Sequence, residues 1–137
     1  VRMMWMILQA DEPEDWVIAT GKSTTVREFV RMSFSEVGIE LKFSGSGIHE
    51  KATVVKCSNP KYQLQVGKEI LSIDPYYFRP TEVALLIGDP TKAKKKLGWE
   101  PEYDLESLVK DMMQSDLKLM QKNLYLKKGG YKNLDFD

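Results

Sequence analysis

The fold class is decided by the stretch Thr25-Val26-Arg27-Glu28-Phe29-Val30-Arg31-Met32-Ser33-Phe34-Ser35-Glu36-Val37-Gly38. Thr25 can accept a hydrogen bond at the start of a helix, and Glu28 three residues later completes the pattern of a capping box. The apolar side chains that follow recur at helical spacing. Gly38 can adopt the left-handed conformation that commonly ends a helix. We therefore predict one amphipathic helix between Thr25 and Gly38.

The segment before this helix is short and apolar. Trp16-Val17-Ile18-Ala19 is rich in strand-forming residues, and Gly21 follows as a turn. A strand, a glycine turn and a helix make half of a βαβ unit. The sequence therefore favours an α/β fold.

The first residues also have the spacing of a helix. Val1, Met4, Trp5 and Leu8 lie on one helix face, but no capping residue and no initiator Met precede them. Pro13 ends the segment, because proline lacks a backbone donor. We expect the chain to start inside a helix and to be the C-terminal portion of a longer protein.

Three further segments have the character of strands. Residues 39–43 alternate between apolar and polar side chains, which is typical of a half-buried strand. Residues 52–57 and 69–73 are further candidates, separated by the polar stretch 58–67. Pairing of these two as a hairpin is a hypothesis at this point.

Two helices are expected in the last third of the chain. Asp89 can cap one of them, with Pro90 at the first helical position. The other begins at Asp104 and extends to about Asn123 with an apolar stripe. We expect residues 1–123 to form one unit with short strands and about four helices, and residues 124–137 to form a polar surface tail.

The composition excludes several classes of protein. The chain has 137 residues, of which 42% are hydrophobic and 29% charged, enough for one domain with a substantial core. Its formal net charge of zero argues against attraction to nucleic acid or acidic membranes by an overall field. A single cysteine, and no secretory or membrane-spanning segment, predict a cytoplasmic protein.

Residues for nucleophilic or metal chemistry are scarce. His49 is the only histidine and Cys57 the only cysteine, so the chain cannot supply the four ligands of a structural zinc site. A Gly-x-Ser-x-Gly nucleophile motif is also absent. We predict a solvated loop position for His49, and neither catalytic residues nor a metal site in this chain.

The most distinctive candidate for ligand binding is Phe78-Arg79-Pro80-Thr81-Glu82. Arg79 is the one arginine outside a predicted helix, and Pro80 favours extended geometry at the residue before it. A guanidinium on stiff backbone suits bidentate binding of a diphosphate, and the Glu82 carboxylate can accept hydrogen bonds from ribose hydroxyls. An Arg79–Glu82 ion pair on a surface turn is the alternative interpretation.

Several segments resemble the C-terminal part of the GDP-mannose 4,6-dehydratases, which are extended short-chain dehydrogenases/reductases. They follow one another in the family's order and comprise residues 4–9, 13–21, 26–30, 74–83 and 88–93, with Leu97-Gly98-Trp99. In this family the Arg of an Arg-Pro-x-Glu motif contacts the diphosphate of the GDP-sugar and the Glu contacts the ribose. The resemblance therefore implies that Arg79 and Glu82 bind substrate.

The resemblance also implies an activity for the whole enzyme. It is the conversion of GDP-mannose to GDP-4-keto-6-deoxymannose, on the route to GDP-fucose and related deoxysugars, with NADP as cofactor and in a dimeric or tetrameric homo-oligomer. The family's Gly-rich Rossmann turn and Tyr-x-x-x-Lys pair are missing from this sequence. We therefore expect NADP and the chemistry to belong to residues outside this chain, which alone should be inactive and poorly folded.

Two other functions remain open. A nucleotide-sugar epimerase or reductase of the same superfamily would share the arginine-plus-acid pattern. A non-catalytic interaction or RNA-binding module would use the lysine-rich segment Lys92–Lys96. Ala93 and Leu97 give that segment the apolar side of a helix, which favours a solvated lysine face over a nucleic-acid surface.

Overall fold

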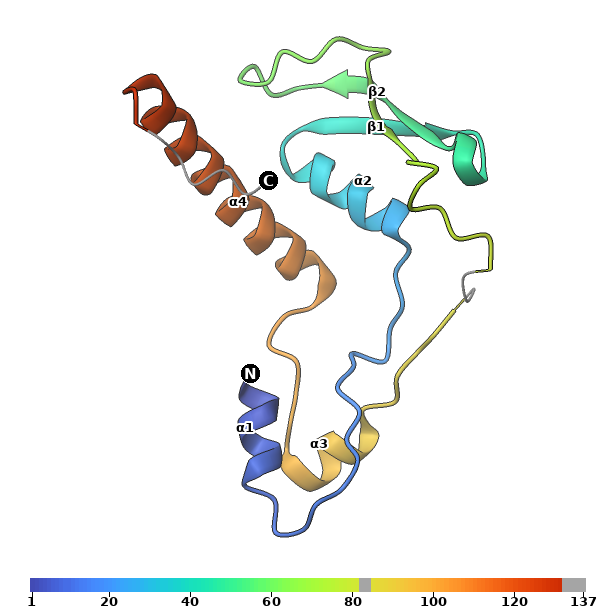
Figure 1. Cartoon of the computed structure of the whole chain (residues 1–137), viewed down its shortest axis with the longest axis vertical. Helices are drawn as coiled ribbons and strands as arrows, with labels where there is room; N and C mark the ends of the chain where they lie inside the picture. Colours follow the sequence, from blue (N-terminus) through green and yellow to red (C-terminus); the bar gives the residue numbers. More distant parts are fainter. Residues whose placement is uncertain (82–84, 132–137) are drawn as a thin grey trace.

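The computed structural model describes residues 1–81 and 85–131. In this part of the chain four α-helices accompany one antiparallel sheet with the strand order β1-β2-β3 (Figure 1). The elements are α1 (Arg2–Leu8), α2 (Val26–Glu36), β1 (Ile39–Ser44), the 3-10 helix η1 (Gly47–His49), β2 (Lys51–Cys57), β3 (Glu69–Ser72), α3 (Thr91–Leu97) and α4 (Leu105–Lys128). The expected mixture of short strands and about four helices is confirmed.

Helix α2 forms where its end signals predict it. The Thr25 hydroxyl oxygen accepts a hydrogen bond from the Glu28 backbone N–H at 3.1 Å, and Gly38 has a φ of +77°. The Glu28 carboxylate does not complete the capping box, because it accepts two hydrogen bonds from the Arg31 guanidinium. Thr25 alone therefore caps the helix with its side chain.

Replacing Thr25 by Ala is expected to destabilise the first turn of α2 by about 1 kcal/mol, because one helix N–H loses its acceptor. Hydrogen exchange of the amides in this turn, followed by mass spectrometry, should accelerate by about fivefold. Thr24→Ala is the matched control, since the Thr24 hydroxyl does not cap α2. Equal exchange in both variants would contradict the role of Thr25.

The sheet, α2 and α4 pack together at one end of the molecule. β2 pairs with β1 from Ile39↔Cys57 to Ser44↔Lys51, and with β3 around Ala52↔Leu71. This confirms the hairpin hypothesis for the second and third strands. Helix α2 packs against both β1 and α4 (Figure 1). The buried side chains here are those of Ile39, Ala52, Val54 and Val109.

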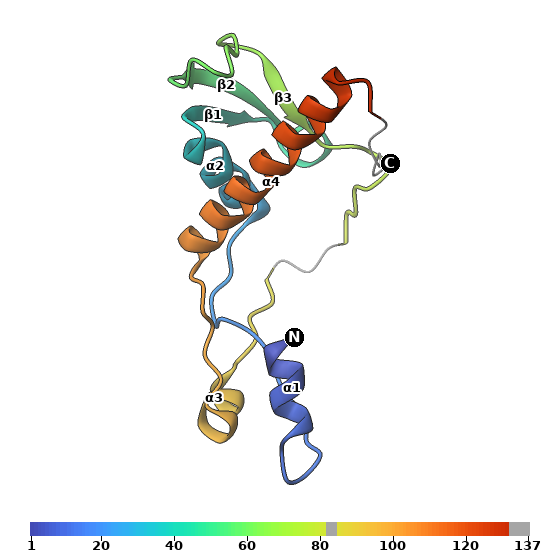
Figure 2. The ribbon, with the colours of Figure 1, turned by 90° about the vertical axis from the view of Figure 1, so that its left-hand side faces the viewer.

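A second, smaller core lies at the other end, where α1 and α3 meet (Figure 2). Met3, Ala93 and Trp99 are buried there, and the partly buried residues around them are Met6, Ile7, Trp16 and Leu97. The opposite face of α1 is open, with Trp5 and Leu8 exposed. The sequence predicted an apolar helix face at positions 1, 4, 5 and 8. In the described part of the structure, a different face of α1 packs into the core.

The strand predicted at Trp16–Ala19 is wrong for this structure. These residues are extended but belong to no sheet, and Val17 and Ile18 are about half exposed. Their neighbour is Gly88, where an added Cβ would come within 2.7 Å of the Ala19 Cβ. A strand requires a partner whose backbone is hydrogen-bonded to it. Among the described residues, no backbone hydrogen bonds join residues 16–19 to the segment around Gly88. Half of a βαβ unit is therefore not formed here, and the sheet is antiparallel.

The boundaries of the last two helices also differ from the expectation. Pro90, rather than Asp89, is the cap residue of α3, although the Asp89 carboxylate still accepts from the Thr91 N–H at 2.9 Å. Asp104 caps α4 as predicted, accepting from the Ser107 N–H at 2.8 Å. The helix does not stop near Asn123 but continues to Lys128, because helix-forming residues persist until Gly129. Much of the described part of the expected tail is therefore helical.

Candidate functional site

The segment that carries Arg79 begins in a tight turn after β3. The Asp74 carboxylate accepts from the Tyr76 N–H at 2.9 Å, and the Asp74 carbonyl accepts from the Tyr77 N–H at 3.1 Å. The rings of Tyr76 and Tyr77 meet edge to face with centroids 5.0 Å apart. The chain then runs from the sheet toward α3 (Figure 1). Arg79 thus follows a locally ordered turn.

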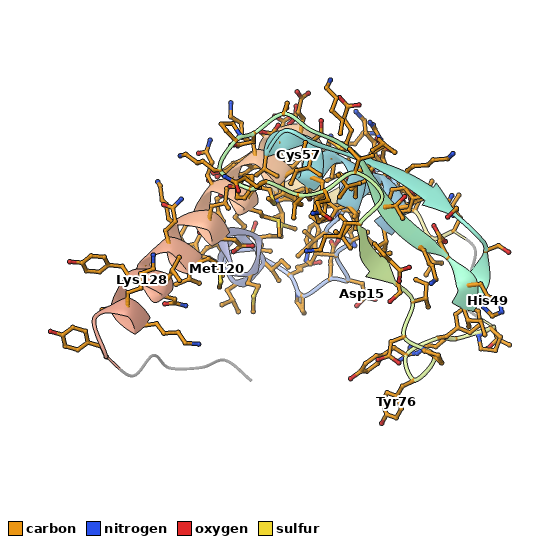
Figure 3. The ribbon with its side chains drawn as sticks, turned by 90° about the horizontal axis from the view of Figure 1, so that it is seen from above. Asp15, His49, Cys57, Tyr76, Met120 and Lys128 are labelled. Carbon is orange, nitrogen blue, oxygen red and sulfur yellow. The ribbon has the colours of Figure 1, made fainter. Side chains whose placement is uncertain are left out.

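Phe78 places this segment next to the turn between β1 and β2. A Cβ built at Gly47 would lie 3.7 Å from the Phe78 ring, so the partly exposed ring lies beside this glycine. Gly47 has a φ of +56°, a conformation that favours glycine. Figure 3 shows Tyr76 and His49, which flank this contact, on the same side of the molecule. Arg79 consequently follows a side chain that lies next to this turn.

Arg79 differs from the other arginines in its surroundings. Arg2 pairs with Glu102, Arg27 with Glu50 at 2.6 Å, and Arg31 with Glu28 at 2.5 Å. Arg79 is exposed, and no carboxylate of residues 1–81 or 85–131 lies within ion-pair distance of it. Its guanidinium is therefore not neutralised by the described part of the chain. Glu82 lies outside the described residues, so its pairing with Arg79 stays a prediction.

An ion pair that the sequence did not reveal links α2 to the same turn. Arg27 at the start of α2 donates to the Glu50 carboxylate, and this hydrogen bond holds the pKa of Glu50 below its usual value. The Arg27 guanidinium also lies 5.9 Å from the centre of the Phe43 ring, within range of a cation–π contact. The two partners are far apart in sequence and share no motif, so only the folded chain identifies them.

The lysines of α3 are partly committed to the N-terminal segment. Glu14 accepts from Lys92 at 2.7 Å and from Lys96 at 2.5 Å, and these hydrogen bonds lower the pKa of the Glu14 carboxyl. The Lys92 ammonium also stands 4.8 Å from the Trp16 ring centre. Two of the lysines proposed for a nucleic-acid surface are therefore paired within the protein rather than simply solvated.

The residues considered for nucleophilic chemistry lie apart. His49 is exposed in η1 next to the Lys51 end of β2, and Cys57 ends the same strand on the far side (Figure 3). The solvated position predicted for His49 is confirmed. His49 and Cys57 lie at opposite ends of β2, so they do not pair as nucleophile and base. Among the described residues, no cluster of three His, Cys, Asp or Glu side chains is arranged to hold a metal ion.

A pocket of about 920 Å³ lies between α2, the start of α4 and the preceding loops. Lys22, Met32, Tyr103 and Leu108 are among its lining residues, whereas Arg79 is not. Arg79 is exposed and does not line this pocket. A ligand bound at Arg79 would therefore lie outside it.

Comparison with known proteins decides the family. Residues 1–112 match the family described as GDP-mannose 4,6 dehydratase. The chain belongs to the GDP-mannose 4,6-dehydratase family. The resemblance seen in the sequence is thereby confirmed, and the Arg79 segment of this dehydratase-family chain lies within the matched range.

Individual dehydratases are similar over most of the chain. A GDP-mannose 4,6-dehydratase of Yersinia enterocolitica is 53% identical over 96% of this chain and 36% of the relative. The Homo sapiens enzyme is 44% identical over 90% of this chain and 31% of the relative. This dehydratase-family chain therefore spans about a third of the length of its curated relatives.

Within residues 1–81 and 85–131, none of the helices has the combination of length and hydropathy that a membrane span requires.

Proposed function

We propose that the protein to which this chain belongs is a GDP-mannose 4,6-dehydratase, and that the chain supplies part of its nucleotide-sugar-binding surface. The observation that carries this proposal is the family match over residues 1–112, and a relative of that name that is 53% identical supports it. The reaction removes water from GDP-mannose to give GDP-4-keto-6-deoxymannose.

In the proposed site, Arg79 binds the diphosphate and Glu82 the ribose of GDP-mannose. Support comes from the exposed guanidinium, which has no described carboxylate within ion-pair distance, and from the Phe78–Gly47 contact beside it. An arginine without an internal partner can offer two parallel N–H donors to phosphate oxygens. An adjacent anchored residue reduces the entropy that the side chain must lose on binding.

The residues of this chain do not fit an NADP site. Its one Gly-x-Gly sequence, Gly45-Ser46-Gly47, leads into the three-residue 3-10 helix η1 rather than into an α-helix whose N-terminus could receive a pyrophosphate. We propose that NADP is bound, and hydride and proton transfer carried out, by parts of a short-chain dehydrogenase/reductase that lie outside this chain. Assembly into a homo-oligomer belongs to the same proposal.

The full-length protein should convert GDP-mannose in the presence of NADP, whereas the 137-residue chain alone should show no turnover. The reason is that the chain supplies binding groups but no hydride carrier. Mass spectrometry of the nucleotide sugar checks both statements, because dehydration removes the mass of one water molecule. Turnover by the isolated chain would refute the proposal that NADP binding and hydride transfer belong to parts of the protein outside this chain. A product of unchanged mass would favour an epimerase.

The RNA-binding alternative has less support. Its lysine-rich helix places Lys92 and Lys96 in contact with Glu14, which offsets the charge that would attract phosphate groups. No specific observation favours the epimerase or reductase over the dehydratase.

A further inference from the structure

The turn between β1 and β2 (residues 45–50) has a compact backbone. Gly45 has a φ of +81°, and a Cβ built on it would come within 2.1 Å of the His49 carbonyl oxygen. Glycine is therefore required at this position. The turn is closed by a hydrogen bond from the Glu50 N–H to the Gly47 carbonyl at 3.2 Å.

Helix α2 contacts one end of this turn through an ion pair. The Arg27 guanidinium donates to the Glu50 carboxylate at 2.6 Å, and it also lies 5.9 Å from the Phe43 ring of β1. The Glu50 side chain is 17% exposed, less than any other side chain that forms an ion pair within residues 1–81 and 85–131. A carboxylate with so little exposure is screened less by solvent than one on an open surface. The pair therefore fixes the turn relative to α2.

The segment that carries Arg79 meets the other end of the same turn. The Phe78 ring lies beside Gly47, at the start of η1. Phe78 is 39% exposed, whereas the rings of Tyr76 and Tyr77 are 85% and 76% exposed. Of these three aromatic side chains, the one next to Arg79 is thus the one that contacts the turn.

We propose that Arg27 is a positioning residue for the substrate. Through its ion pair with Glu50 it holds the turn, and with the turn Phe78, in the place from which Arg79 reaches the diphosphate. The inference rests on the proposed function, in which Arg79 binds the diphosphate of GDP-mannose. Arg27 acts through these contacts and not by binding phosphate, because its own guanidinium is paired with Glu50.

The first test measures the dissociation constant of GDP-mannose for the full-length protein by isothermal titration calorimetry. Arg27→Ala and Glu50→Gln should each weaken binding by about threefold to tenfold, because each breaks the same ion pair. Arg31→Ala is the matched control, since it breaks an ion pair with Glu28 in the same helix that does not involve the turn. Parent-like binding by either Arg27→Ala or Glu50→Gln would overturn the proposal.

The second test asks whether Arg27 acts through Arg79. In an Arg79→Ala protein, the added Arg27→Ala substitution should weaken binding by less than about twofold, because the guanidinium that it positions is gone. If the two losses multiply, Arg27 acts independently and the proposal is wrong. The same variants separate this inference from the proposed function. Parent-like binding by Arg79→Ala alone contradicts the proposed function, whereas a loss in Arg79→Ala without one in Arg27→Ala contradicts only the positioning role.

Steady-state kinetics distinguish positioning from a purely structural role of the ion pair. For Arg27→Ala we expect a raised KM with a kcat within about twofold of the parent, because a diphosphate contact serves the ground state and the transition state alike. A partly unfolded protein would instead have a lower kcat with an unchanged KM. Glu50→Gln repeats the measurement with a side chain of nearly the same size. A lowered kcat with unchanged KM in both variants would show that the pair only stabilises the fold.

Discussion

Replacing Arg79 by Ala in the full-length protein is expected to weaken binding of GDP-mannose by about one to two orders of magnitude, or roughly 1.5–3 kcal/mol. The loss is large because the guanidinium is the proposed partner of the diphosphate and makes charge-assisted hydrogen bonds to it. The fold should be unaffected, since Arg79 is exposed and forms no ion pair with the described residues. Isothermal titration calorimetry with GDP-mannose measures the change directly.

Two further variants make this result specific. Arg79→Lys should recover only part of the affinity, because an ammonium keeps the charge but lacks the planar pair of donors. Arg31→Ala removes an arginine that is already paired with Glu28 inside α2, so it should bind GDP-mannose like the parent. If Arg79→Ala and Arg79→Lys both bind like the parent, the assignment of the diphosphate to Arg79 is wrong.

Replacing Trp99 by Ala is expected to lower the free energy of unfolding by about 3–5 kcal/mol. Trp99 is 9% exposed and fills the small core with Met3 and Ala93, where a cavity would be left behind. Among the described residues that core comprises three buried and four partly buried side chains, so removing the indole takes away a large part of it. Denaturant unfolding of the full-length protein gives the change in midpoint.

The conservative variant Trp99→Phe provides the control. Phenylalanine keeps most of the apolar surface and should lose less than half of the stability that Trp99→Ala loses. Equal midpoints for Trp99→Ala and the parent would show that α1 and α3 are held together by other contacts. The two predictions are independent, because Arg79 lies on the surface and Trp99 in a core.

The helices of this protein are largely predictable because their end signals are local. Thr25 and Asp104 accept hydrogen bonds from N–H groups three residues later, and Gly38 and Gly98 end helices with positive φ. Such contacts depend only on neighbours in the chain. The sequence therefore located α2, α3 and α4, and missed chiefly where α4 ends.

The strands show the opposite behaviour. The alternation in residues 39–43 predicted β1 correctly, but Trp16–Ala19 has equally strong strand propensity and pairs with no strand in the described chain. Strand formation depends on a partner that is distant in sequence, so propensity alone cannot decide it. The candidate site was likewise only partly predictable. Arg79 was identified from its sequence motif. The Arg27–Glu50 ion pair and the proximity of Phe78 to Gly47 were not, because these residues are distant in sequence.

By itself the sequence determined the starts of α2 and α4, the resemblance to a dehydratase family and the arginine that is the best candidate for binding a diphosphate. Only the tertiary structure decided that Arg79 has no ion pair among the described residues, that Lys92 and Lys96 are held by Glu14, and that Val109 of α4 is buried. The physical reason is the sequence separation between the groups that interact. Caps and motifs act over a few residues, whereas ion pairing and burial are set by groups that meet only when the chain is folded.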